Sequence, residues 1–371
     1  MRILLTGGGT GGHLSPLVAV ARELKKIQRE RQAFNLELFY LGPNDFSRTF
    51  LANEGIKIKI ITTGKLRRYV SAATFLDLFK LPIGLLQALL HVLIWMPDAT
   101  FSKGGYGSLP AVMASWLYRI PIIIHESDSM PGLANRRLAP FAKYITVSFP
   151  TAAKFFPGKK TAFVGIPTRK ELATGSIEEA KTDFGLSTGK PIIFIIGGSQ
   201  GAQPINHLIF LTLPRLLAKY ELIWQTGKKN HDSVSAEIIE TLGKIPEGCH
   251  ITPFLDEKQM SEALAAASLV ISRASATSIF EIALCGKPSI IIPLPSSASG
   301  HQRENALEYA ANGGAVLLNQ ENLTPNILLN EINQILNNPS LVREMSASAK
   351  AFAKPDAARQ IAEELINLTA R

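Results

Sequence analysis

The sequence is poor in cysteine and in long apolar runs. It has two cysteines among 371 residues, too few for a disulfide framework, so a reducing compartment is expected. The longest apolar stretch, residues 81–97, has 17 residues without a formal charge and is interrupted by Pro82 and Gly84, whereas a membrane-spanning helix needs about 20 apolar residues. Only three apolar residues follow Arg2 before the glycines begin, which is too few for a secretory signal. These absences argue against a secreted or transmembrane protein.

Motifs that mark several common enzyme classes are also missing. The sequence has no Gly-x-x-x-x-Gly-Lys-Ser/Thr loop, which argues against phosphoryl transfer on a P-loop. Its seven histidines are scattered without metal-ligand spacing, so no dedicated metal site is expected. No Asp-x-Asp occurs, which removes the usual handle by which a divalent cation holds a sugar diphosphate. Backbone N–H groups, helix dipoles and basic side chains must then neutralise any diphosphate ligand.

Charge is present but unevenly distributed. Hydrophobic residues make up 46% and charged residues 19% of the chain, which is a globular composition. Residues 1–165 contain 21 Lys and Arg against 9 Asp and Glu, whereas residues 166–371 contain 18 against 21. The first part is strongly basic and the second mildly acidic, which indicates an anionic partner for the first part.

Short apolar runs alternate with longer amphipathic segments along the chain. Strands buried on both faces read as continuous apolar runs, and helices between them imply parallel crossovers. The pattern predicts an α/β fold with two Rossmann-like, doubly wound parallel-sheet domains. The first is expected over residues 1–165, with a C-terminal helix at 352–371 packing back on it, and the second over residues 166–351. The predicted strands are Ile3–Thr6, Leu36–Leu41, Ile56–Ile61, Ala99–Ser102, Ile122–His125, Tyr144–Val147, Pro191–Ile196, Glu221–Gln225, His250–Thr252, Leu269–Ser272 and Ser289–Pro293.

A strand, a glycine turn and a helix follow one another twice. The turns are Gly7–Gly12 and Gly197–Gly201, and each contains a hydroxyl residue, Thr10 or Ser199. Such turns at the carboxyl ends of strands present N–H groups to anions, although they also allow close helix–strand packing. The first turn fits the dinucleotide fingerprint, but the second strand ends Phe39–Gly42 without the acidic residue that holds ribose hydroxyls. NAD or FAD binding is therefore not favoured.

Three further polar segments lie where ligand-binding loops are expected. Ser102–Ser108 and His125–Asp128 follow predicted strands, and His301–Asn305 opens a late helix. Polar groups at the carboxyl ends of parallel strands are candidates for a binding site. Each segment alone is also compatible with helix capping or a buried polar network, but together they favour a site.

These segments together resemble the MurG family of bacterial glycosyltransferases. The similarity runs in order through residues 1–16, 102–110, 125–136, 197–206, 273–288 and 301–306. It implies a GT-B fold, with an acceptor-binding N-terminal domain and a UDP-GlcNAc-binding C-terminal domain. It also implies the reaction of peptidoglycan synthesis. In that reaction GlcNAc passes, with inversion, from UDP-GlcNAc to the C4 hydroxyl of lipid I, undecaprenyl-pyrophosphoryl-MurNAc-pentapeptide, to give lipid II. No metal or other cofactor is implied.

The resemblance assigns most of the donor site to the second half of the chain. Arg169 and Ser199 would hold the diphosphate in place of a cation. Leu255 would offer backbone groups to the uracil, Glu281 would accept bonds from the ribose hydroxyls, and Gln302 would bond to GlcNAc hydroxyls. The other matched donor positions are Thr10, Gly11, Gly12, Asp128, Ala276, Thr277, Ser278, Ile279 and Phe280.

The same resemblance implies catalytic and acceptor-binding residues in the first half. His13 would be the general base, since a neutral imidazole suits proton removal from an alcohol, and Glu126 is the second catalytic candidate. Tyr106, His125 and Asn135 match acceptor-site positions. Many relatives read His-Glu-Gln-Asn where this chain has His-Glu-Ser-Asp at 125–128. Asp128 therefore brings a negative charge close to a substrate that carries a diphosphate.

A basic and aromatic segment predicts contact with a membrane surface. Lys65, Arg67 and Arg68 lie close in sequence to Phe75 and Phe79. Such a patch binds anionic lipid with about 1 kcal/mol per basic residue, although the aromatic side chains also suit packing on a sheet. The implied location is peripheral, on the cytoplasmic face of the inner membrane, where the enzyme would serve cell-wall growth, cell shape and division. No nucleic-acid partner is expected, and binding to other cell-wall enzymes is left open.

Other functional classes remain compatible with the sequence. One is a different GT-B transferase that glycosylates a membrane lipid such as diacylglycerol. Another is a UDP-GlcNAc epimerase, which needs no lipid acceptor, and a third is a non-catalytic nucleotide-binding scaffold. Labelled UDP-GlcNAc distinguishes the first two classes from the lipid I transferase. The first would label diacylglycerol, and the second would convert the free nucleotide sugar without a lipid acceptor.

Overall fold

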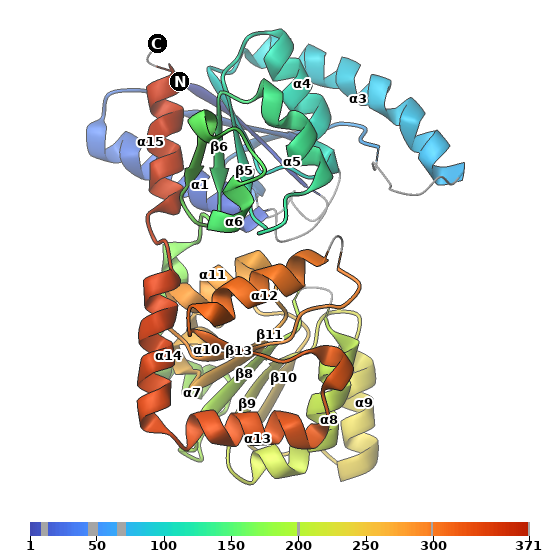
Figure 1. Ribbon diagram of the computed structural model, residues 1–371, viewed down its shortest axis with the longest axis vertical. Coiled ribbons are helices and arrows are strands. Elements are labelled where there is room, and N and C mark those ends of the chain that lie inside the picture. The colour runs from blue at the N-terminus through green and yellow to red at the C-terminus, as the bar shows by residue number, and fades with distance from the viewer. Residues whose placement is uncertain (9–13, 44–50, 65–71, 199–200, 298–299, 370–371) are drawn as a thin grey trace. The chain divides into compact units, whose positions relative to one another are not determined.

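Two compact units make up the chain (Figure 1). The computed structural model describes residues 1–8, 14–43, 51–64, 72–198, 201–297 and 300–369, with the backbone alone at 72–79. Unit 1 comprises residues 1–169 and 354–371, and unit 2 comprises residues 170–353. The sequence predicts divisions after residues 165 and 351, whereas the structure divides the chain after residues 169 and 353.

Unit 1 is built on a parallel sheet. Among the described residues the strand order is β3-β2-β1-β4-β5-β6-β7, with every neighbouring pair parallel. The strands are β1 (Arg2–Thr6), β2 (Glu37–Gly42), β3 (Lys57–Ile60), β4 (Ala99–Ser102), β5 (Ile122–Glu126), β6 (Tyr144–Val147) and β7 (Thr161–Phe163).

Helices cover both faces of the unit 1 sheet. On β1, Ile3 and Leu5 pack in the core that includes α1 and the C-terminal helix, whereas Leu4 packs with Ala88 and Ala111 on the other face. This alternation follows from the two-residue period of a strand. None of the helices among the described residues has both the length and the apolarity to cross a membrane. The helices are α1 (Leu14–Arg31), α3 (Ala72–Trp95), α4 (Leu109–Leu117), α5 (Leu133–Leu138), α6 (Pro150–Ala153) and α15 (Ala357–Thr369).

The C-terminal helix returns to unit 1. Helix α15 lies beside α1 (Figure 1), and its Ile361 and Leu365 are buried in the same core cluster as Leu17. At the edge of this packing Arg359 pairs with Glu30 at 3.0 Å. The expected helix at 352–371 is in fact the end of α14 (Pro339–Phe352), a short connection and then α15.

Unit 2 repeats the parallel design. The strand order within the described residues is β10-β9-β8-β11-β12-β13, and the pairs are parallel throughout. The strands are β8 (Ile192–Ile196), β9 (Glu221–Gln225), β10 (Cys249–Thr252), β11 (Leu269–Ser272), β12 (Ser289–Ile291) and β13 (Ala315–Leu317). The helices besides α14 are α7 (Ile177–Asp183), α8 (Gln203–Leu217), α9 (His231–Leu242), α10 (Glu257–Ala266), α11 (Ala276–Leu284), α12 (His301–Ala311) and α13 (Pro325–Leu336).

The α/β prediction with two parallel sheets is confirmed. The sequence-based strands omit β7 and β13, which are edge strands of three residues each. Both are partly exposed, so neither gives the long apolar run by which a central strand is recognised.

The packing of α15 generates a stability prediction. We expect Leu365→Ala to lower the free energy of unfolding by about 2–5 kcal/mol, because Leu365 is fully buried and truncation leaves a cavity. Hydrogen exchange should show the loss of protection in the β1 and β4 amides and not in β8 or β11. Leu242→Ala is the control, since Leu242 is 38% exposed. Equal losses in both units would contradict the assignment of α15 to unit 1.

Candidate functional site

Each sheet has a point at which the strand order reverses. In unit 1 this point lies between β1 and β4, and in unit 2 between β8 and β11. The loops that follow such a pair of strands diverge, and open parallel sheets bind ligands at this carboxyl edge. Each unit therefore has a candidate half-site formed by the loops around its own reversal point.

Some predicted site residues lie outside the described part of the chain. They are Thr10, Gly11, Gly12, His13, Lys65, Arg67, Arg68 and Ser199. The side chains of Phe75 and Phe79 are also outside it. The described residues Gly7, Gly198 and Gly201 adjoin the two glycine loops. The last two have φ of +82° and +80°, a backbone region that favours glycine.

In unit 1 the loop after β4 packs against the loop after β1. The Lys103 N–H donates to the Thr6 carbonyl at 2.9 Å, and the Lys103 side chain is buried. Gly104 has φ +83°, and a Cβ at this position would collide with the Asn135 carboxamide. A glycine is therefore required here by both conformation and space. Tyr106 follows in a short 3-10 turn and is half-buried.

The Glu126 carboxylate organises the loop after β5. One of its oxygens, Oε1, accepts from the Asp128 N–H at 3.0 Å. The other, Oε2, accepts from the Gly132 N–H at 3.1 Å and from Asn135 Nδ2 at 2.9 Å. Burial raises the pKa of the Glu126 carboxyl, with Asp128 acting in the same direction. Both oxygens are thus engaged with the protein, so the geometry fits loop positioning better than direct proton transfer.

His125 lies beneath this loop and is fully buried. Its Nδ1 is 3.0 Å from Thr146 Oγ1, and its Nε2 is 3.1 Å from Ser148 Oγ. Burial, and secondarily the positive charge of Lys103, holds the pKa of the imidazole well below its usual range. His125, Glu126, Asp128 and Asn135 therefore form one network, in which His125 is neutral and supports the loop from below.

In unit 2 an asparagine in the first turn of α8 ties this helix to β9 and to the loop that follows β9. Asn206 Nδ2 donates to the Thr226 carbonyl at 2.9 Å, and Asn206 Oδ1 accepts from Trp224 Nε1 at 3.1 Å. Asn206 is 2% exposed, so this amide orients the start of α8 from within. The start of α8, which follows the glycine turn, is therefore held in place, and a helix start of this kind suits an anion.

The predicted ribose segment is the first part of α11. Ser275 caps this helix, because its side chain accepts from the Ser278 N–H at 3.1 Å. The segment divides into core and surface positions. Ala276, Ile279 and Phe280 are buried, whereas Thr277 and Ser278 are half-buried. Glu281 is 8% exposed. The polar members thus share a helix whose apolar members anchor it.

Gln302 and Arg273 hold the loop that follows β12. Arg273 donates from one guanidinium nitrogen to the carbonyls of Ile292 and Pro293, each at 3.2 Å. Gln302 Oε1 accepts from the Leu294 N–H at 3.0 Å, which leaves its NH₂ group as the donor for a ligand. Burial lowers the pKa of the Arg273 guanidinium to about 10.

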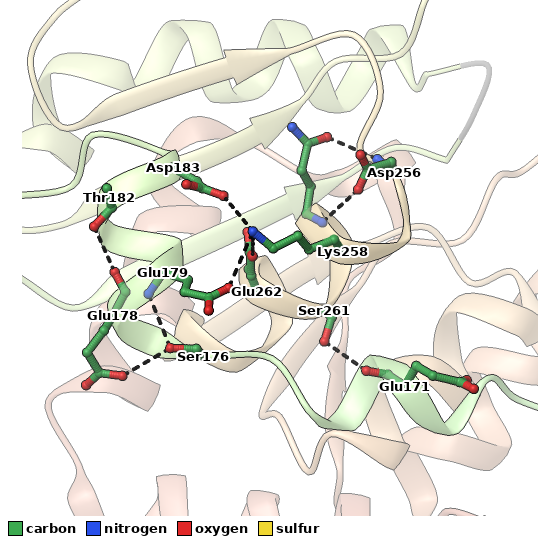
Figure 2. Close-up of polar contacts among 11 residues, drawn as sticks. Glu171, Ser176, Glu178, Glu179, Thr182, Asp183, Asp256, Lys258, Ser261 and Glu262 are labelled. Atoms are coloured by element: carbon green, nitrogen blue, oxygen red, sulfur yellow. Dashed lines mark hydrogen bonds and ion pairs between the residues drawn. The ribbon is translucent and has the colours of Figure 1, made fainter.

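Leu255 lies between β10 and α10, and α10 is braced against α7. Asp256 forms a capping box with Gln259 at the start of α10. Figure 2 shows Lys258 reaching toward the carboxylates of both helices. Lys258 Nζ lies 3.4 Å from the nearest carboxylate oxygens of Glu179 and Asp183, and 3.1 Å from Glu262 Oε1. This acidic cluster is occupied by the lysine ammonium, which fixes the helix that follows Leu255.

Arg169 is the last residue of the first segment of unit 1, although the sequence-based division assigns it to the second domain.

Within the described ranges no group of three or more His, Cys, Asp or Glu side chains is suited to hold a metal ion. Among the residues of these half-sites, sequence reasoning assigns no role to Lys103 or Arg273. A lysine placed directly after a buried strand and before two glycines was the available signal for Lys103.

The two units match one class of enzyme. Residues 3–147 match the N-terminal domain of glycosyltransferase family 28, and residues 192–361 match its C-terminal domain. The crystal structure of Acinetobacter baumannii MurG is similar with a TM-score of 0.74 and 25% identity, over 99% of each chain. A Neisseria meningitidis UDP-GlcNAc 2-epimerase bound to UDP-GlcNAc shares the fold at a TM-score of 0.69, with 13% identity and 99% and 100% of the two chains covered.

Curated relatives narrow the class. A protein of Clostridium tetani is 36% identical over 91% of this chain and 90% of its own length. One of Bacillus cytotoxicus is 34% identical over 99% of both chains. Both are named UDP-N-acetylglucosamine–N-acetylmuramyl-(pentapeptide) pyrophosphoryl-undecaprenol N-acetylglucosamine transferase. The chain therefore belongs to this transferase family, the MurG family, and has the GT-B fold.

The buried neutral His125 generates a pH prediction. The pKa of His125 is depressed in the folded state. Below about pH 6.5 this imidazole is therefore protonated in the unfolded chain but stays neutral in the folded chain. We expect this contribution to the free energy of unfolding to be present above pH 7 and to decrease as the pH falls, by up to about 1.4 kcal/mol per pH unit. His125→Gln should be less stable at pH 8 but lose less stability between pH 7.5 and 5.5.

Hydrogen exchange of the β5 and β6 amides at several pH values measures this difference. His207→Gln is the control, because His207 is exposed on α8 and keeps its solvation in the folded chain. The same slope in wild type and His125→Gln would show that His125 does not contribute.

Proposed function

We propose that the protein transfers GlcNAc from UDP-GlcNAc to the C4 hydroxyl of lipid I, with inversion, to give lipid II for peptidoglycan synthesis. The observation that carries this proposal is the similarity to transferases of that name over nine-tenths or more of the chain. The GT-B fold and the two family 28 domains agree with it.

In this proposal unit 2 supplies most of the donor site, and Arg169 at the end of the first segment of unit 1 contributes to it. Backbone N–H groups after β8 and at the start of α11 receive the diphosphate, together with Ser199 and Arg169. The uracil lies against the Leu255 backbone and the ribose against Glu281. Gln302 donates its NH₂ group to a GlcNAc hydroxyl, since its oxygen already accepts from the Leu294 N–H. The hydrogen bonds that hold the loop after β12 reduce the loss of conformational entropy when a ligand binds there.

The acceptor binds to unit 1, and the proton leaves through His13. As the C4 hydroxyl attacks C1 of GlcNAc, the imidazole takes the hydroxyl proton and UDP departs with the bonding electron pair. A general base of this kind contributes about 10²–10⁴-fold. Glu126 acts by holding the loop at 127–132, as its three accepted hydrogen bonds suggest, and Tyr106 and Asn135 lie on the acceptor side.

A transfer assay tests the reaction and its base. With labelled UDP-GlcNAc and a lipid I analogue we expect labelled lipid II, retained in EDTA because no cation is required. Diacylglycerol should not be labelled, and free UDP-GlcNAc should not be epimerised. His13→Ala should lower kcat by about 10²–10⁴-fold, whereas His207→Ala should not. Full turnover by His13→Ala would refute His13 as the general base, and the lack of any lipid product would refute the proposed reaction.

We further propose that unit 1 binds the cytoplasmic face of the membrane, peripherally, through an apolar stripe on α3. Ile83, Leu86, Leu90, Leu93 and Ile94 are 51–67% exposed. Their spacing places them on one side of the helix, opposite the buried Ala88 and Val92. Exposed apolar areas of this kind mark interaction surfaces.

The neighbouring helix α4 also exposes apolar side chains. Helix α4, which packs on α3, adds the exposed residues Trp116 and Leu117. Trp116 contacts Phe141 edge-on, and the Arg136 guanidinium lies over the Phe155 ring at 5.9 Å. Apolar side chains flanked by cations suit an interface with anionic lipid. The proposal thus extends the predicted patch at residues 65–79 toward the end of α3.

The double variant Leu86→Gln/Leu90→Gln tests this surface. Because it removes apolar area that would be buried in lipid, we expect partitioning onto phosphatidylglycerol vesicles to fall about tenfold or more. Activity on a short-chain, water-soluble acceptor should be kept. Ile239→Gln/Leu242→Gln is the matched control on α9, where both residues are exposed. Equal partitioning of the two double variants would refute the membrane role of α3.

A further inference from the structure

The acceptor half-site contains a buried lysine that the proposed reaction does not yet use. Lys103 follows β4 at the reversal point of the unit 1 sheet, and it is 2% exposed. Its ammonium donates a hydrogen bond to Ser127 Oγ. A lysine is rarely buried this deeply unless charged groups compensate it. The charges around Lys103 therefore indicate its role.

Ser127, which accepts the hydrogen bond from this ammonium, stands in sequence between two acidic residues, Glu126 and Asp128. Glu126, which is 4% exposed, and Asp128 both favour the charged form of Lys103, against the effect of burial. Lys103 in turn lowers the pKa of the Glu126 carboxyl, whereas Asp128 raises it. The Asp128 N–H also binds Glu126 Oε1 at 3.0 Å, so the two acidic residues are held together by the backbone. Loss of the lysine would therefore leave these two carboxyl groups without its compensating positive charge.

The charge balance of this loop affects how it can bind a ligand that carries a diphosphate. A sugar linked to a diphosphate brings further negative charge to the edge of the sheet, and like charges repel one another strongly in a poorly solvated site. The same carboxylate, Glu126, orders the backbone from Asp128 to Gly132 and orients Asn135. Charge balance and loop geometry are therefore coupled through one network.

We propose that Lys103 is a positioning residue for the acceptor, whose buried ammonium balances Asp128 and keeps the loop at 126–132 able to receive a diphosphate-linked sugar. This inference rests on the proposed function. It accounts for the combination of an aspartate at 128 with a lysine at 103, since the extra negative charge of the one is compensated by the positive charge of the other.

A double-mutant cycle tests the proposal. Lys103→Met removes the charge with little loss of side-chain volume, and Asp128→Asn removes the opposite charge. We expect Lys103→Met to lower kcat/KM for the lipid I analogue about 30-fold, with KM for UDP-GlcNAc within about twofold of wild type. In the double variant Asp128→Asn should recover about tenfold of that loss, because the two residues are coupled. A double variant no better than Lys103→Met would overturn the proposal.

Two further variants separate charge from packing. Ser127→Ala removes the hydrogen-bond partner but keeps every charge, so it should cost less than about threefold in kcat/KM. A loss equal to that of Lys103→Met would assign the role to the hydrogen bond and refute charge balance. Lys159→Met is the control, since Lys159 is an exposed lysine of the same unit, and it should behave as wild type.

Melting temperatures of the same cycle keep the test independent of activity. Lys103→Met should melt below wild type, and Asp128→Asn in that background should recover part of the difference. If Lys103→Met fails to fold, a folded double variant supports the proposal and an unfolded one overturns it. A wild-type protein that transfers nothing to lipid I would refute the proposed reaction, and the melting cycle would still decide whether Lys103 and Asp128 are coupled.

Discussion

Parallel pairing of the strands is the constraint on which both half-sites depend. Because all strands of each sheet run in one direction, their carboxyl ends lie along one edge, and the chain must return through helices packed on the faces. The reversal of strand order at β1/β4 and at β8/β11 then separates the loops at that edge. Segments distant in sequence, such as 102–106 and 125–135, become neighbours for this reason.

The loops at that edge are held from within by buried polar side chains. In unit 2, Asn206 ties the start of α8 to the loop after β9, and Arg273 and Gln302 hold the loop after β12. In unit 1, Glu126 and His125 have the corresponding task with ionisable groups. Buried polar atoms need partners, so each side chain fixes a loop as it satisfies its own hydrogen bonds. Preorganised loops of this kind suit a ligand whose charge is met by N–H groups and cations.

Sequence reasoning identified the long elements and the polar clusters more reliably than the task of each residue. The central strands were recognisable because apolar residues fill both of their faces, whereas β7 and β13 are short and partly exposed. Hydrogen bonds join Asn135 to His125 and Glu126 in the structure. Their local roles were not predictable, because a motif does not reveal that both imidazole nitrogens bond to hydroxyls on β6 and the loop after it.

The sequence by itself determined the fold class and the family, since hydrophobic periodicity and ordered motifs are properties of the chain alone. Only the tertiary structure decided that Lys103 is buried beside Ser127, that α1 is the helix against which the C-terminal helix packs, and that the exposed stripe of α3 continues to Ile94. Burial and charge compensation depend on which residues meet across strands and helices. These contacts depend on the packing of the whole unit and not on the spacing of residues along the chain.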